Sequence, residues 1–117
     1  MAYMLLVVEP PEQRSTRTDE EGREAYASML RFSDELKRRG LLTVSQSLKS
    51  PTPGARLKMQ GDSAVVTDGP YAETKEVIGG FFLLTCETHE EAMKIARECP
   101  AAQWATIEVR ELGPCFA

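Results

Sequence analysis

We predict an α+β fold, organised as a single domain over residues 1–117, from three observations. The chain has the length of one average domain, and its 42% hydrophobic and 27% charged residues are typical of a compact protein. Two segments carry apolar residues at helical spacing, each behind a capping-box sequence. Short segments rich in β-branched and aromatic residues precede, separate and follow them, as strands would.

The first strand is expected over Tyr3 to Val8, where both alternate sets of side chains are apolar. Such a strand needs cover on both of its faces. A helix over residues 19–39 should follow, because Thr18 and Glu21 form a capping-box sequence. Gly40 suits the left-handed conformation that ends a helix. The apolar stripe of this helix consists of Ala25, Met29, Phe32 and Leu36.

A period of two from Leu42 to Leu48 predicts a strand with two different faces. Residues 56–60 and 64–67 then predict a hairpin around a tight turn at Gly61-Asp62. The apolar face of the strand consists of Leu42, Val44 and Leu48, and the hydroxyl-lined face of Thr43, Ser45 and Ser47.

The C-terminal half repeats the order of strand, helix and strand. Gly79-Gly80 leads into a strand over residues 81–86, which is apolar on both sides. A second capping-box sequence at Thr88 to Glu91 begins a helix that ends at Pro100, since proline cannot continue a helix. The last strand is expected over residues 106–110, where polar and apolar residues alternate.

This order is the split βαβ arrangement of the ferredoxin-like fold with an extra hairpin strand. Two helices can cover only one face of such a sheet, yet the strands at Tyr3 to Val8 and at residues 81–86 are apolar on both faces. A second copy packed sheet to sheet would bury the other face. We therefore predict a homodimer, with two copies forming a dimeric α+β barrel.

Several functional classes are not expected. A net charge of −4 gives no positive field for nucleic acid, and no apolar run approaches the roughly 20 residues of a membrane span. Three cysteines without CxxC spacing favour neither a disulfide framework nor a zinc site, which suits the cytoplasm. No phosphate-binding glycine loop, dinucleotide fingerprint or metal-ligand cluster is present, so we expect no cofactor and no metal.

The polar segment from residue 68 to 76 has the highest density of reactive side chains. Asp68 would be a general base, and Tyr71 or Lys75 a proton donor. Glu73 and Glu76 would contact a ligand. The alternative is a plain Asp-Gly turn followed by a solvated charged face.

A second group of polar residues is expected on the dimer side of the sheet. Glu108 and Arg110 lie opposite the apolar positions of the last strand, and with Ser45 and Ser47 they would line a small-molecule cavity. The alternative for Glu108 and Arg110 is a salt bridge between neighbours. Glu9 is a third candidate carboxylate, unless it simply leaves the sheet into solvent.

The string DGPYAETKE at Asp68 to Glu76, together with Gly79-Gly80 and Ile107 to Arg110, resembles the DGPF branch of the YCII-related proteins. In that branch DGPFAETKE recurs, so Tyr71 stands where phenylalanine is usual. The resemblance implies a dimeric α+β barrel with a cleft beside this loop. The branch has no agreed activity, although some members are encoded beside or fused to sigma factors of the extracytoplasmic-function class.

Other branches of the YCII-related family look built around a His and Asp pair that suits general acid–base catalysis. The one histidine of this chain, His89, lies instead at the start of the second predicted helix. A histidine-dependent hydrolase is therefore not expected. The main hypothesis is a cytosolic homodimer that binds a small organic molecule beside the DGP loop, with cofactor-independent acid–base catalysis as an extension. The alternative is a non-enzymatic interaction or regulatory module linked to a sigma factor. Whether the chain is an enzyme stays open at this point.

Overall fold

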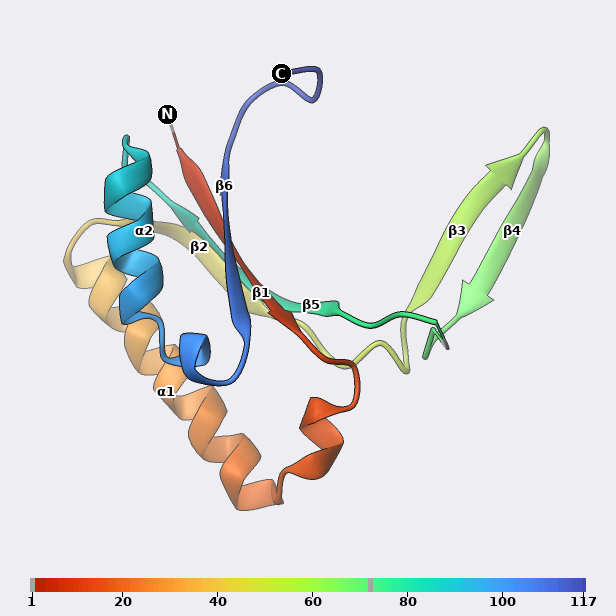
Figure 1. The fold of residues 1–117 in the computed structure, drawn as a ribbon, viewed down its shortest axis with the longest axis horizontal. Coiled ribbons are helices and arrows are strands. Elements are labelled where there is room, and N and C mark those ends of the chain that lie inside the picture. Colours follow the sequence, from red (N-terminus) through yellow and green to blue (C-terminus); the bar gives the residue numbers. More distant parts are fainter. Residues whose placement is uncertain (1, 72) are drawn as a thin grey trace.

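The computed structural model describes residues 2–71 and 73–117, and its main sheet has four strands with two helices against one face (Figure 1). The sheet order is β2-β5-β1-β6, and every pairing is antiparallel. This order matches the predicted split βαβ arrangement. The strands of the sheet are β1 (Tyr3–Glu9), β2 (Leu42–Ser47), β5 (Val77–Leu84) and β6 (Thr106–Glu111).

The helix α1 (Asp19–Arg38) begins and ends as its sequence predicts. Thr18 accepts a hydrogen bond from the backbone N–H of Glu21, whose carboxylate accepts one from the N–H of Thr18, so the capping box is complete. Gly40 adopts a φ of 70°, and the N–H of Leu41 reaches back to the carbonyl of Leu36. This Schellman arrangement satisfies carbonyls that the helix end would otherwise leave unpaired.

The second helix, α2 (His89–Glu98), follows Thr88, which accepts a hydrogen bond from the N–H of Glu91. Two short 3-10 helices were not predicted. They are η1 (Gln13–Thr16), which precedes α1, and η2 (Pro100–Gln103), which follows α2. Both are single turns without the apolar period that reveals a longer helix.

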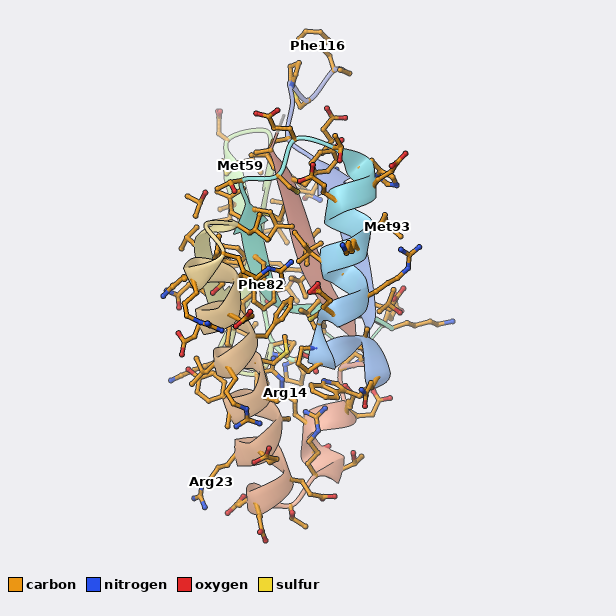
Figure 2. All side chains as sticks on the ribbon, turned by 90° about the vertical axis from the view of Figure 1, so that its left-hand side faces the viewer. Arg14, Arg23, Met59, Phe82, Met93 and Phe116 are labelled. Atoms are coloured by element: carbon orange, nitrogen blue, oxygen red, sulfur yellow. The ribbon has the colours of Figure 1, made fainter. Side chains whose placement is uncertain are left out.

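The core lies between the two helices and the sheet. Leu5, Leu36 and Leu84 are fully buried, and the rings of Phe32 and Phe82 meet edge to face at 5.3 Å. Figure 2 shows Phe82 between α1 and α2. Burial of each such side chain contributes about 1.5–3 kcal/mol, so this layer holds the helices on the sheet.

The opposite face of the sheet carries no helix (Figure 1). Side chains alternate along β1, so the set that does not face the helices is only half-buried. The same holds for Phe81 and Leu83 on β5, where Ile78 is 48% exposed. We call this surface the open face; its apolar members are Met4, Leu6, Val8, Val44, Ile78, Phe81 and Leu83.

The hairpin of β3 (Ala55–Gln60) and β4 (Ser63–Asp68) forms a separate two-stranded sheet that projects from the body (Figure 1). The hairpin predicted over residues 56–60 and 64–67 is therefore confirmed, but neither of its strands joins the main sheet as the expected extra strand. Every residue of both strands is exposed, including Leu57 and Val66, which face each other across the hairpin. One face of the hairpin is apolar, and no other part of the described chain buries it.

The predicted faces of β2 are wrong beyond its first residue. The pairing of β2 with β5 shifts between Leu42 and Val44, so Ser45 stands opposite the buried Phe82. Ser45 and Ser47 therefore face the helices, and Val44 faces the open side. A one-residue irregularity reverses every later side chain in a strand, and the alternation in the sequence does not reveal it.

Candidate functional site

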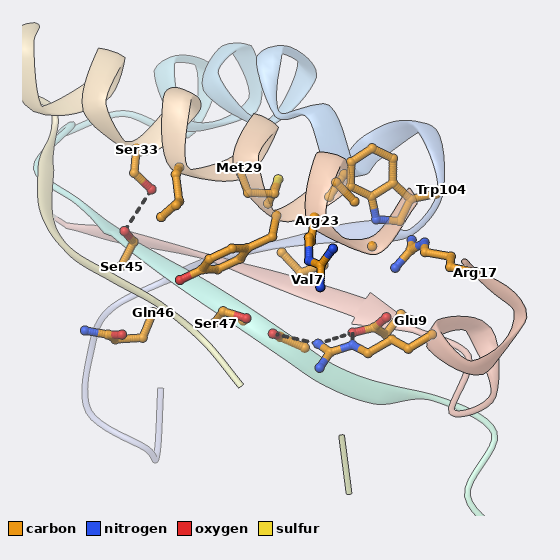
Figure 3. Close-up of a pocket in the computed structure, with 18 of the residues that line it drawn as sticks. Val7, Glu9, Arg17, Arg23, Met29, Ser33, Ser45, Gln46, Ser47 and Trp104 are labelled. Atoms are coloured by element: carbon orange, nitrogen blue, oxygen red, sulfur yellow. Dashed lines mark hydrogen bonds and ion pairs between the residues drawn. The ribbon is translucent and has the colours of Figure 1, made fainter. Parts of the chain in front are cut away.

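A cavity of about 540 Å³ lies between α1 and the sheet, close to the end of β1 (Figure 3). This volume is within the range of small-molecule sites. We call it the α1 cavity. Its deep wall is formed by buried residues and its mouth by exposed ones, so it opens to solvent along α1.

The deep wall is largely apolar. Val7 and Phe82 come from the sheet and Met29 from α1, and all three also pack on the core. Ser33 and Ser45 face each other across the cavity end, with 2.9 Å between their hydroxyl oxygens (Figure 3). These two hydroxyls satisfy each other, and the surface beside them suits an apolar ligand body.

Glu9 and Arg14 form an ion pair at the other end of the cavity. Oε1 of Glu9 accepts hydrogen bonds from Arg14 Nη2 at 2.8 Å and Arg14 Nε at 3.2 Å. Arg14 also donates through Nη1 to the carbonyl of Leu48 at 2.6 Å and through Nη2 to that of Gly79 at 3.2 Å. One guanidinium thus joins the ends of β1 and β2 to β5.

Glu9 is only 5% exposed, so the alternative that it enters solvent is wrong. Burial of a carboxylate is unfavourable unless a partner and hydrogen bonds compensate, and Arg14 supplies both. The second oxygen, Oε2, makes no hydrogen bond within the described residues. Glu9 is at the same time one of the residues that line the cavity.

Gly79 makes room for the ion pair. It is the extra residue of β5 at a bulge, because Val7 pairs with Gly80 and Val8 with Ile78. A Cβ atom on Gly79 would overlap Oε1 of Glu9 and lie 2.8 Å from Arg14 Nη2. The glycine pair was expected to precede the strand, but it lies inside β5 and allows this close approach.

The mouth of the cavity carries two further arginines, Arg17 and Arg23. Cζ of Arg17 lies 5.5 Å from the centre of the Trp104 ring, a cation–π distance. Neither arginine forms an ion pair within residues 2–71 and 73–117. Tyr26, 53% exposed, adds a phenol to the same rim.

Comparison with known proteins bears on the whole chain. The model of the YCII-related domain matches residues 1–115. The chain belongs to the YCII-related family. It is also 31% identical over 115 residues to an uncharacterized protein of Rhizobium meliloti (strain 1021), an alignment that covers 97% of this chain and 93% of that protein.

In this YCII-related chain the DGP loop lies away from the α1 cavity, at the base of the hairpin. Asp68 is the exposed last residue of β4, and Glu73 and Lys75 are exposed as well. Cζ of Arg56 lies 3.8 Å from the centre of the half-buried Tyr71 ring. Within the described residues Asp68, Tyr71 and Lys75 make no side-chain hydrogen bond to one another, and Ala72 lies outside those residues.

Gly69 has a structural role in this loop. Its N–H donates to the carbonyl of Gly54 at 2.9 Å, and a Cβ atom at Gly69 would overlap the carbonyl oxygen of Pro51. The missing side chain lets the DGP loop lie against residues 51–54. Glu76, the remaining predicted ligand contact of the loop, is exposed and lines a separate hollow of about 360 Å³ beside Trp104.

The predicted cavity of Glu108, Arg110, Ser45 and Ser47 is not formed, because the four residues lie on two faces. Glu108 and Arg110 stand opposite Leu6 and Met4, on the open face, with 3.4 Å between Arg110 Nη1 and Glu108 Oε2. Ser45 and Ser47 line the α1 cavity instead. The bulge in β2 accounts for the separation.

The cysteines match their predicted environments, with Cys86 and Cys99 buried and Cys115 exposed. Burial raises the pKa of both the Cys86 and the Cys99 thiol. His89 is exposed at the first position of α2, with its ring 6.2 Å from that of Tyr3. In the described part of the chain, no three His, Cys, Asp or Glu side chains gather as metal ligands, and no helix has the length and apolar character of a membrane span.

Arg14, Arg17 and Arg23 were not singled out from the sequence. Arg14 lies in η1, Arg17 just before α1 and Arg23 in α1. All three line the α1 cavity because η1 lies against β5, where Arg14 donates to the carbonyl of Gly79. The signal that could have pointed to Arg14 is its place five residues after the carboxylate at the end of a buried strand. An acid at such a strand end needs a nearby cation.

Proposed function

We propose that this YCII-related protein is a homodimer that binds a small organic molecule in the α1 cavity. The observation that carries the proposal is the buried carboxylate of Glu9 in the cavity wall, one oxygen of which is held by Arg14 while the other makes no hydrogen bond within the described residues. Concave apolar sites with a few placed polar groups are typical of small-molecule binding.

The ligand would contact the two parts of the cavity differently. Its apolar portion would lie on Val7, Phe82 and Met29, and a hydroxyl or N–H group would donate to Oε2 of Glu9. A carboxylate in this position could also accept a proton from a bound molecule. Acid–base chemistry is thus an extension of the proposal, with Glu9 rather than Asp68 as the base nearest the cavity.

The dimer is supported by the surface that one chain leaves exposed. The isolated chain has 8225 Å² of accessible surface, whereas a compact monomer of its mass would have about 6,300 Å². Its radius of gyration is 16.0 Å against about 13 Å for a compact domain of this length. The excess of about 1,900 Å² per chain exceeds the surface that each partner contributes to a standard interface.

The occupant we propose for the open face is a second copy of the chain. The open face and the apolar face of the hairpin are both unpartnered in one chain, and a two-fold axis would bring each near its counterpart. The closed barrel expected from the DGPF resemblance is one such assembly. The DGP loop, at the base of the hairpin, would then lie near the interface.

Mass measurement tests the dimer. Light scattering after size exclusion should give twice 13.0 kDa. Phe81→Asp should yield a monomer, because it places a charge in the middle of the open face. Phe116→Asp, which changes a residue that is 89% exposed near the C-terminus, is the control and should leave the mass unchanged. A monomeric parent would refute the dimer.

Thermal shift against a metabolite library tests the cavity. A ligand that binds the folded state raises the melting temperature. Ala25→Phe fills the cavity from α1 and should abolish the shift, whereas Lys94→Phe adds the same ring to an exposed position on α2 and should not. If the rise in melting temperature is lost in Asp68→Asn but kept in Ala25→Phe, the ligand binds at the DGP loop and not in the α1 cavity.

A further inference from the structure

We infer that the ligand of the α1 cavity is an organic anion with an apolar body, an inference that rests on the proposed function and names its ligand class. The apolar wall accounts for the body of the ligand. The anionic group is assigned from the charges around the mouth, which differ from those of the rest of the chain.

The balance of charge in the cavity is positive. Glu9 and Arg14 neutralise each other at the deep end. Arg17 and Arg23 then face a single further acid, Asp19, among the lining residues. The chain as a whole has a net charge of −4, so the excess of one cation is confined to the lining residues; Glu21, outside the lining, also lies within electrostatic range of Arg17. A local positive potential in a concave site concentrates anions.

The two mouth arginines are free to bind. In the described ranges, 2–71 and 73–117, no carboxylate is paired with either, although other residues form five ion pairs, among them Glu9 and Arg14 in the cavity itself. Cζ of Arg17 lies 5.5 Å from the centre of the Trp104 ring, so a cation–π contact places its guanidinium beside the cavity wall. A guanidinium presents its N–H donors in a fork that matches carboxylate, sulfonate or phosphate oxygens.

The end of the cavity at Glu9 places a second requirement on the ligand. Oε2 of Glu9 is an acceptor and would repel an anionic group placed beside it. The anion of the ligand must therefore lie at the mouth, with Arg17 and Arg23, and a neutral donor must point toward Glu9. The cavity thus fixes the direction in which the ligand enters as well as its charge.

Two fluorescent dyes of nearly the same shape test this inference. 6-Anilinonaphthalene-2-sulfonate carries an anion and an N–H group at opposite ends of an apolar body, and N-phenyl-2-naphthylamine lacks the sulfonate. We expect the anionic dye to bind about tenfold more tightly, since hydrogen bonds between oppositely charged groups are stronger than those of neutral groups. Arg17→Gln/Arg23→Gln should remove this preference, while Arg97→Gln, an exposed change on α2, should retain it.

The cavity-filling variant Ala25→Phe separates the possible failures, with circular dichroism to verify that each variant is folded. If both dyes bind equally and both are lost in Ala25→Phe, the ligand class is wrong and the proposed function stands. If Ala25→Phe affects neither dye, or neither dye binds the parent, the cavity is not a binding site and both proposals fail. A preference for the anionic dye that persists in the double variant also refutes the assigned role of the two arginines.

Discussion

A Cβ atom on Gly79 would overlap Oε1 of Glu9, so the buried carboxylate fills the space that any other side chain at position 79 would need. The bulge in β5 brings these two residues together, because it inserts Gly79 opposite the end of β1. Bulges often occur beside functional sites, where they redirect a strand. The α1 cavity therefore depends on a backbone feature as well as on its side chains.

Gly79→Ala should lower the free energy of unfolding by about 1–3 kcal/mol, the usual effect of overpacking. Gly22→Ala is the matched control, since a Cβ atom there meets nothing within 4 Å. That change should stabilise α1 by about 0.5–1 kcal/mol, because alanine loses less backbone entropy than glycine. Urea denaturation measures both, and equal stability of Gly79→Ala and the parent would contradict the role of the bulge.

Arg14→Gln should destabilise the protein by about 3 kcal/mol, because it leaves the buried Glu9 carboxylate without its cation. The double variant Glu9→Gln/Arg14→Gln should be less destabilised than the sum of the two single variants. Arg31→Gln breaks an exposed pair with Glu24 and should cost under about 1 kcal/mol. Additive effects in the Glu9 and Arg14 cycle would show that the two side chains are not coupled.

The capping box should make stability depend on pH through Glu21. The hydrogen bond from the Thr18 backbone N–H lowers the pKa of Glu21 below its usual 4.5. Its stabilisation is therefore present above pH 4.5 and is lost as the pH falls through the lowered value. Glu21→Gln should show a smaller loss of stability between neutral and acidic pH than the parent, and Glu24→Gln a loss like that of the parent. Identical pH profiles for Glu21→Gln and the parent would refute this.

The thiols should react in two classes. Cys115 is exposed, whereas burial raises the pKa of Cys86 and Cys99 above the usual 9.0. A thiol reagent should label one cysteine quickly in the native protein, and Cys115→Ser should remove that reaction. Above pH 9 stability should fall, because the unfolded thiols lose protons before the folded ones. Rapid labelling of all three cysteines in the native state would contradict the burial.

Regular elements follow from the sequence because their signals are local and repeated. The stripe of Ala25, Met29, Phe32 and Leu36 fixes α1, and the caps at Thr18 and Gly40 set its ends. The open face was also foreseen in β1, since a strand apolar on both sides needs two covers. Each inference drew on several residues that agree, so one irregular position could not overturn it.

The site was harder to predict, because single positions decide it. Because of the bulge near Thr43, Ser45 lies on the opposite face of the sheet from Glu108. Apart from the glycine itself, nothing in the sequence indicates the bulge at Gly79. The reactive side chains of the DGP loop are neighbours in the sequence, which is why the sequence predicts a site there. The α1 cavity instead brings together residues that are far apart in the sequence, such as Arg14 and Trp104. Contacts of this kind depend on the exact course of loops and strand ends, which the local patterns that predicted the topology do not reveal.

Arg14 joins the ends of β1 and β2 to β5 at the wall of the α1 cavity, and this limits how related proteins could diverge. Exchange of Glu9, Arg14 or Gly79 would alter affinity and folding at once. Arg23 and Tyr26 are exposed residues of the cavity rim, so we expect substitutions there to change the preferred ligand with little effect on folding. We therefore expect related proteins to differ in ligand preference mainly through substitutions on the exposed side of α1.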